Sequence, residues 1–332
     1  MYLSTNNGRI DVFDALKGVA IILMIVNHVK LDGSFLFRFI GVFHMPLFFI
    51  LSGYLYKNRS MADMIHRNVK KILLPYLVTC LILWLLKVVF EGNYIWGLSI
   101  IYGNSRPLPS SVLEMIKVGP LWFLTAFFCS MIYVKILLCI ESKLIRWIVI
   151  SVVFALSVVF VQKTGILFPF GMTTGLGGTI FVLAGMELKE NPQLFFNKKA
   201  LYLGLLLWLI CICIGGLSMA AHKYKLSLLH VVGGVYGTYI CYKIVCQLRC
   251  DSVFYRFLCY VGKNSLVILC IHTLDRVLKI TFEISNYILG YAKTDFLHWQ
   301  LEIALKFLFV LIIFSILRQI PILRKVYSIQ KE

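Results

Sequence analysis

The chain has 332 residues, of which 60% are hydrophobic and 14% charged, and its mean hydropathy is +0.86. A soluble domain carries about 25% charged residues, so this composition excludes a soluble domain and indicates a protein that lies in a lipid bilayer. The net charge of +18 does not indicate nucleic-acid binding, because the cations are spread over predicted loops at the membrane edges and form no basic-aromatic module.

Ten apolar segments are long enough, at roughly 17–25 residues, to cross a bilayer as helices. They lie at residues 12–29, 39–56, 73–90, 121–140, 145–161, 173–188, 201–220, 227–247, 253–274 and 301–320. The ninth is the weakest, because it contains Arg256 and Lys263. We therefore predict an all-α fold: a single membrane-embedded domain over residues 1–332, built as a polytopic bundle of about ten transmembrane helices.

The distribution of Lys and Arg predicts the orientation of these spans. Cytoplasmic loops carry an excess of Lys and Arg, and the predicted loops on the side of the N-terminus are the richer in these residues. With an even number of spans, both termini are expected in the cytoplasm. The expected location is the cell membrane, with membrane lipid as the surrounding partner.

The first apolar segment carries three ionisable residues, Asp14, Lys17 and His28. Ionisable groups inside a membrane are costly and tend to be functional. Lys17 and His28 are eleven residues apart, which places them on one helix face about 16 Å apart along the axis. They cannot touch each other, but they can contact two ends of one long ligand or face two sides of the membrane.

Most of the other histidines are predicted near the outer side of the membrane. His44 lies beside a kink expected at Pro46, and His230 and His272 lie near the outer ends of their segments, as His28 does. His222 and His298 lie in outer connections. Histidines at one depth suit proton transfer to or from a hydroxyl group. A packing or interfacial histidine is the alternative interpretation for each of them.

A basic cluster follows the second apolar segment, in the sequence MIHRNVKKILLPY. Arg67, Lys70 and Lys71 are spaced to share one side of a short helix that is expected to end at Pro75. Such a one-sided cluster suits a polyphosphate group. The alternative interpretation is a basic anchor at the cytoplasmic face of the membrane.

The first two segments carry a resemblance to a known family. The sequence DALKGVAIILMIVNHV resembles the Asp-x-Leu-Arg-Gly opening of the acyltransferase-3 family, with ten residues between the basic residue, here Lys17, and His28. The following HMPLFFILSGYLYK, from His44 to Lys57, has the Phe-Phe-x-x-Ser-Gly-Tyr pattern that is typical of the family. The resemblance is narrower to the stand-alone branch that is similar to fucose-4-O-acetylases.

Later segments extend the resemblance over nearly the whole chain. Arg67 and Lys70 correspond to the Arg-x-x-Arg motif of the family, with Lys in place of the second Arg. The segments GPLWFLTAFF (119–128) and GKNSLVILCIHTL (262–274) are also similar to family segments. Lys17 likewise stands where Arg is common, and Lys lacks the bidentate fork of Arg.

The resemblance implies transfer of an acetyl or other acyl group from cytoplasmic acyl-CoA to a sugar hydroxyl of a cell-envelope polysaccharide or lipid-linked glycan. Acetyl-CoA is then a donor co-substrate, with no permanently bound cofactor and no metal. His28 is the expected catalytic base or acyl carrier, assisted by Lys17 and His44, and the CoA phosphates are expected at Arg67, Lys70 and Lys71. Lys17 is expected to orient the donor or a neighbouring carboxylate, that of Asp14, which is three residues away. Further candidates for substrate binding are Asp14, Trp122 and His272.

Two alternatives from other classes remain open at this stage. One is a transporter or flippase of a lipid-linked glycan, in which the charged helices would line a pathway. The other is a membrane assembly or sensor protein without catalytic activity. The sequence does not specify the sugar, the length of the acyl group, the leaflet of the acceptor or the oligomeric state.

Overall fold

The computed structural model describes residues 5–6, 9–29, 34–107, 116–193, 197–290 and 295–330. Within these ranges the chain is built almost entirely from helices. They are α1 (Asp11–Asn27), α2 (Phe35–Tyr54), α3 (Met61–Asn68), α4 (Leu74–Glu91), α5 (Leu98–Tyr102), α6 (Trp122–Leu137), α7 (Lys143–Thr164), α8 (Met172–Glu190), α10 (Lys198–Ile214), α11 (Leu228–Cys246), α12 (Val253–Lys263), α13 (Ser265–Leu278), α14 (Ile280–Leu289), α15 (Asp295–Gln319) and α16 (Pro321–Val326).

Short elements complete the described chain. Two antiparallel pairs of two-residue strands join β1 (Thr5–Asn6) to β2 (Arg9–Ile10) and β3 (Leu217–Ser218) to β4 (Lys223–Tyr224). A π-helical turn, Val69–Leu73, connects α3 to α4, and a 3₁₀ turn, Gly119–Leu121, precedes α6.

Each of the ten predicted apolar segments is helical in the structure, which confirms a helical membrane protein. Among the described residues, six helices are long and apolar enough to cross a membrane, or seven if the bent pair α12–α13 is one span. The other three segments correspond to α1 and α10, with 17 residues each, and to the Gly- and Thr-rich α8, with 19. The predicted count of about ten is therefore not confirmed.

The predicted ninth span, 253–274, is not one straight helix. It breaks at Asn264 into α12 and α13, whose axes are bent by 73°. The Asn264 side chain donates to the carbonyl oxygen of Tyr260 at 3.0 Å and accepts from the backbone N–H of Gln330 at 3.0 Å. The break therefore has polar partners of its own, as backbone irregularities at membrane depth require.

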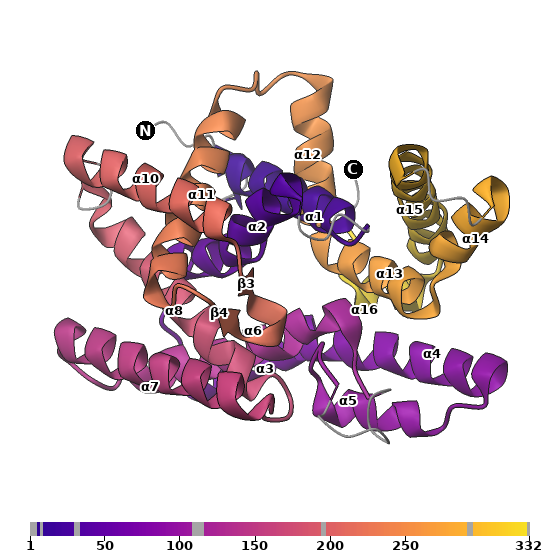
Figure 1. Cartoon of the computed structure of the whole chain (residues 1–332), viewed down its shortest axis with the longest axis horizontal. Coiled ribbons are helices and arrows are strands. Elements are labelled where there is room, and N and C mark those ends of the chain that lie inside the picture. Colours follow the sequence, from indigo (N-terminus) through magenta and orange to yellow (C-terminus); the bar gives the residue numbers. More distant parts are fainter. Residues whose placement is uncertain are drawn as a thin grey trace.

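Helix α1 lies in the middle of the fold and packs against α2, α12 and α13. Figure 1 shows α1 and α2 between α10 and α11 on one side and α13 to α15 on the other. Glycines bring α1 and α12 close together, because a Cβ at Gly262 would lie 1.7 Å from the carbonyl oxygen of Asp14. Small residues allow helix backbones to approach in this way in membrane proteins.

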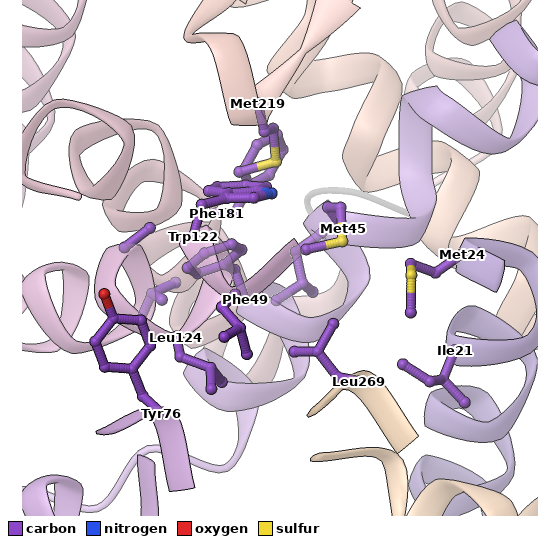
Figure 2. Close-up of a cluster of buried hydrophobic side chains, with 14 of the residues drawn as sticks. Ile21, Met24, Met45, Phe49, Tyr76, Trp122, Leu124, Phe181, Met219 and Leu269 are labelled. Atoms are coloured by element: carbon purple, nitrogen blue, oxygen red, sulfur yellow. The ribbon is translucent and has the colours of Figure 1, made fainter. Parts of the chain in front are cut away.

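The main apolar core fills the space between these central helices. It includes side chains from α1, α2, α6, α8 and α13, and Figure 2 shows Ile21, Met24, Met45 and Leu269 directed toward the same region. The outer helices instead expose apolar side chains, as on α7, where Leu144 is 70% and Leu156 65% exposed. Lipid is the solvent that suits such a surface.

Candidate functional site

The end of α1 presents His28, whose tautomer is fixed by the backbone. His28 follows Asn27, the last residue of α1, and its Nδ1 lies 2.7 Å from the carbonyl oxygen of Met24. A carbonyl oxygen only accepts hydrogen bonds, so Nδ1 carries the proton and Nε2 carries the lone pair. His28 is half-buried. Its Nε2 is thus prepared to accept a proton.

His272 of α13 faces His28. The two ring centroids are 5.0 Å apart and the ring planes are inclined by 58°. His272 is fully buried, and neither of its ring nitrogens has a hydrogen-bond partner among the residues that the structure describes. The sequence proposed both residues, but it gave no sign that the break at Asn264 would turn α13 toward the end of α1.

His44 of α2 is the third histidine of this region. It is buried, its Nδ1 donates to the carbonyl oxygen of Ile40 at 2.7 Å, and it interacts electrostatically with His28. Its Nε2 is therefore also an acceptor. Three helices supply three histidines to one region, which we call the histidine site (His28, His44 and His272).

The remaining histidines predicted on the outer side do not join the histidine site. His222 Nε2 hydrogen-bonds to Ser157 Oγ at 2.7 Å, His230 Nδ1 accepts from the backbone N–H of Leu226 at 3.1 Å, and His298 Nε2 hydrogen-bonds to Asn286 Oδ1 at 2.8 Å. A similar predicted depth therefore did not bring all of these side chains together.

A buried ionic network lies next to the histidine site, and the sequence analysis missed it. Lys306 Nζ donates to Asp275 Oδ2 at 2.8 Å and to Thr281 Oγ1 at 3.1 Å, and it lies 3.1 Å from Glu302 Oε1. The three charged side chains are at most 4% exposed. Asp275 follows His272 by three residues on α13, so the network connects this helix to α15. We call it the Lys306 network.

Two cations act on the histidine pair: Lys306, which is paired with two carboxylates, and Arg276. Lys306 and Arg276 both interact electrostatically with His28 and with His272. Arg276 is exposed and stands four residues after His272 on α13. The sequence did contain a signal for this region, because Glu302 and Lys306 are ionisable residues inside a predicted span.

At the other end of α1, Lys17 pairs with Asp14. Lys17 Nζ lies 2.5 Å from Asp14 Oδ1, and the carboxylate is buried while the lysine side chain is 26% exposed. This contact is the one that the three-residue spacing suggested. Because α12 packs on the backbone of Asp14, the ion pair lies at the junction of α1 and α12.

The basic cluster is exposed, but it does not lie on the predicted short helix. Arg67, Lys70 and Lys71 are all exposed. The helix does not end at Pro75: it continues from α3 through the π-helical turn Val69–Leu73 into α4, where Pro75 occupies the first turn. Directly before Pro75, the backbone N–H of Leu74 bonds to the carbonyl oxygen of Val69, five residues back, so the helix is wider at the point where proline supplies no N–H and its ring needs space. The prediction of a helix end there was wrong.

Trp122 is buried at the start of α6. It is 5% exposed, makes an edge-to-face contact with Phe123, and belongs to the main apolar core. The Gly119–Leu121 turn before it packs against α13, the helix that carries His272. A role of Trp122 in sugar binding stays a prediction.

These features define a helical membrane protein with paired histidines at its centre, and the comparisons identify its family. The model of the acyltransferase domain, acyltransferase-3, matches residues 10–318. The chain therefore belongs to this family and is an acyltransferase. The family assignment covers the histidine site and the basic cluster, since both lie within the matched residues.

Two curated proteins are similar to part of the chain. Nodulation protein NolL of Mesorhizobium japonicum is 30% identical over 171 residues, which cover 46% of this chain and 42% of that protein. Nodulation protein NolL of Sinorhizobium fredii is 30% identical over 156 residues, covering 43% and 40%. The matches thus span less than half the length of these relatives. No solved structure matches the chain.

Proposed function

We propose that the protein transfers an acetyl group, or another acyl group, from cytoplasmic acyl-CoA to a sugar hydroxyl of a cell-envelope polysaccharide or lipid-linked glycan. The observation that carries the proposal is the hydrogen bond from His28 Nδ1 to Met24, which leaves Nε2 as a base beside His272. General-base catalysis needs such a lone pair within reach of the hydroxyl proton.

In the proposed reaction, His28 takes up one proton and gives it back. Nε2 accepts the hydroxyl proton while the hydroxyl oxygen bonds to the thioester carbonyl carbon. The carbon–sulfur bond then breaks, and the departing CoA thiolate takes the proton from His28. The products are the sugar ester and free CoA, and the enzyme returns to its starting state. A transient acyl group on Nε2 is the covalent variant of the same scheme.

The donor is expected to enter from the side of the basic cluster. Exposed cations suit the CoA phosphates through charge-assisted hydrogen bonds, and Arg67, Lys70 and Lys71 offer three of them. The main apolar core contains Met24 and Met45, which contribute flexible side chains. Methionine adapts to irregular occupants, which suits the passage of a pantetheine arm.

Lys17 and Asp14 are proposed to orient the donor end of α1. Their ion pair lies about three helical turns from His28. His44 is proposed to assist the proton transfer through its acceptor nitrogen, and Trp122 to contribute to the acceptor side.

The proposed topology keeps ten crossings. The helices α1, α8 and α10 and the bent pair α12–α13, added to the six long apolar helices, account for the ten segments. An even number places both termini in the cytoplasm of the cell, and the richer share of Lys and Arg on that side supports this orientation.

A direct assay tests the activity. The full chain, purified and reconstituted into lipid nanodiscs, is incubated with acetyl-CoA carrying a labelled acetyl group and with fucose-containing oligosaccharides or lipid-linked glycans from the host membrane. We expect labelled, base-labile ester on the glycan together with stoichiometric release of CoA. Failure to acylate any glycan in the presence of folded protein would contradict the proposal, and movement of the glycan across the bilayer would favour the flippase.

A further inference from the structure

His272 differs from the other buried histidines of the described chain in its hydrogen bonding. His44, His222 and His230 each have one ring nitrogen bonded to a backbone or hydroxyl group. His272 is 0% exposed and has neither nitrogen bonded among the described residues. A buried polar group without a partner costs free energy, so a group that persists in this state suggests a partner that binds there.

The backbone around His272 is held firmly in place by other contacts. Thr273 Oγ1 donates to the carbonyl oxygen of Leu269 at 2.8 Å, and Asp275 accepts from Lys306 and from both the N–H and the hydroxyl of Thr281. The Lys306 network thus fixes α13 against α15. The imidazole is positioned by its helix rather than by hydrogen bonds of its own, and both ring nitrogens stay available.

The two rings of the pair are complementary in what they can offer. His28 has already donated its N–H to Met24 and offers a lone pair. A neutral His272 carries one N–H that is committed to no described residue. Acyl transfer requires both functions, a base for the attacking hydroxyl and a donor for the carbonyl oxygen on which negative charge develops.

We propose that His272 is a catalytic residue that donates its N–H to the carbonyl oxygen of the acyl thioester, as the oxyanion-stabilising group of the reaction. This inference rests on the proposed acyltransferase function. As the hydroxyl oxygen bonds to the carbonyl carbon, the carbonyl π electrons move onto the oxygen, and the His272 N–H stabilises that charge. The electrons return when the carbon–sulfur bond breaks. His272 keeps its proton throughout, and His28 carries the transferred one.

The charges around the pair favour this division of roles. The Lys306 network contains two carboxylates and one ammonium group, and Arg276 adds a second cation close to both rings. The two carboxylates balance the charge of Lys306, so Arg276 is the cation that favours negative charge at the site, and solvent weakens its effect because Arg276 is exposed.

The test compares two substitutions of similar size at position 272 in the reconstituted full chain. His272→Gln retains an N–H donor, whereas His272→Leu removes it. With labelled acetyl-CoA as donor, we expect His272→Leu to lose about 10²- to 10³-fold in kcat, as removal of one oxyanion donor does elsewhere, and His272→Gln to recover a measurable part of that loss. His230→Leu, at another buried histidine, serves as the matched control and is expected to keep the wild-type kcat.

A second readout separates catalysis from packing. Because the His272 nitrogens have no hydrogen-bond partner among the described residues, replacing the ring with an apolar side chain should leave the thermal unfolding midpoint equal to or above that of the wild type. The affinity for free CoA, which has no thioester carbonyl, should also be unchanged. A wild-type kcat in His272→Leu, or equal losses of kcat in the Leu and Gln variants accompanied by a lower Tm, would overturn the inference. If the wild type itself fails to acylate any glycan, the proposed function fails instead.

Discussion

Two buried histidines of this protein, His272 and His222, differ in their hydrogen bonding to the described residues. His222 ends the short turn Met219–Ala221 and is tied to Ser157 of α7 at 2.7 Å, with Phe154 and Tyr224 packed edge-to-face around its ring. Burial lowers the pKa of His222 to about 4, so the ring is neutral at physiological pH. It connects the β3–β4 hairpin to α7 and has the features of a packing histidine.

His272 has a histidine as its neighbour and no hydrogen bond to a described residue. The comparison shows that burial alone does not mark a functional histidine, because both side chains are 0% exposed. What differs is whether a described residue forms a hydrogen bond with the imidazole ring. The predictions below test this difference, beginning with the network that holds His272 in place.

The charge of Lys306 should contribute far more to the free energy of unfolding than that of Lys87, which also pairs with a glutamate four residues away. Lys306→Met leaves two buried carboxylates without their cation, and breaking a buried pair in this way costs about 3–5 kcal/mol. Lys87 of α4 also pairs with a glutamate four residues away, Glu91, but this glutamate is 41% exposed. Lys87→Met should cost at most about 0.5 kcal/mol. Equal unfolding midpoints of the two variants in detergent would contradict the structural role assigned to the network.

Removing the basic cluster should weaken donor binding without affecting the chemical step. Charge-assisted hydrogen bonds contribute about 1.5–3 kcal/mol each, so the triple variant Arg67→Ala, Lys70→Ala, Lys71→Ala should raise the KM for acetyl-CoA by tenfold or more. The kcat at saturating donor should stay close to that of the wild type. The variant Lys198→Ala, Lys199→Ala removes exposed cations at the start of α10 and should change neither constant. An unchanged KM in the triple variant would leave the cluster as a membrane anchor.

The contribution of Lys17 to stability and activity should depend on the charge of its side chain more than on its shape. Lys17→Ala leaves the buried Asp14 carboxylate without this cation, which is expected to cost about 1–3 kcal/mol of stability, together with part of the activity. Lys17→Arg restores the charge and should restore both. Thermal unfolding and turnover measured on the same preparations distinguish the cases, and an inactive but fully stable Lys17→Ala protein would indicate a direct contact with substrate.

Ser157→Ala should have the smallest effect on turnover, and it tests the His222 side of the comparison. It leaves the buried His222 ring without a hydrogen bond to a described residue, which costs about 1–3 kcal/mol of stability, and it touches no part of the histidine site. Turnover should stay at the wild-type level while the unfolding midpoint falls slightly. A large loss of turnover would mean that the hairpin and α7 take part in the reaction.

The sequence predicted the helices of this fold better than their arrangement. Each apolar segment became helical because hydrophobicity and length are local properties. The bend at Asn264 was not predictable in this way, since a polar residue between two short helices gives no direction for the second one. The continuation of the helix through Pro75 was missed because it depends on the π-helical turn Val69–Leu73, and no local sequence pattern predicts such a turn.

The candidate site was predicted in part. His28 and the Asp14–Lys17 pair followed from one helix, where spacing determines geometry. The approach of His272 to His28 depends on tertiary packing across more than two hundred residues, and no local pattern reveals it. Glu302 and Lys306 were visible as charges inside a span, but their partner Asp275 lay just beyond the predicted end of another segment, so the network could not be assembled from the sequence.

The central claim is that acyl transfer occurs at the His28–His272 pair. Turnover of labelled acetyl-CoA into glycan ester, measured in parallel for the wild type, His28→Ala and His222→Ala in nanodiscs, tests it most directly. Loss of a general base costs about 10²- to 10⁴-fold, so we predict at least a hundredfold loss of kcat in His28→Ala and near wild-type kcat in His222→Ala when both remain folded. Persistence of wild-type turnover in His28→Ala, or its loss in His222→Ala alone, would contradict the account.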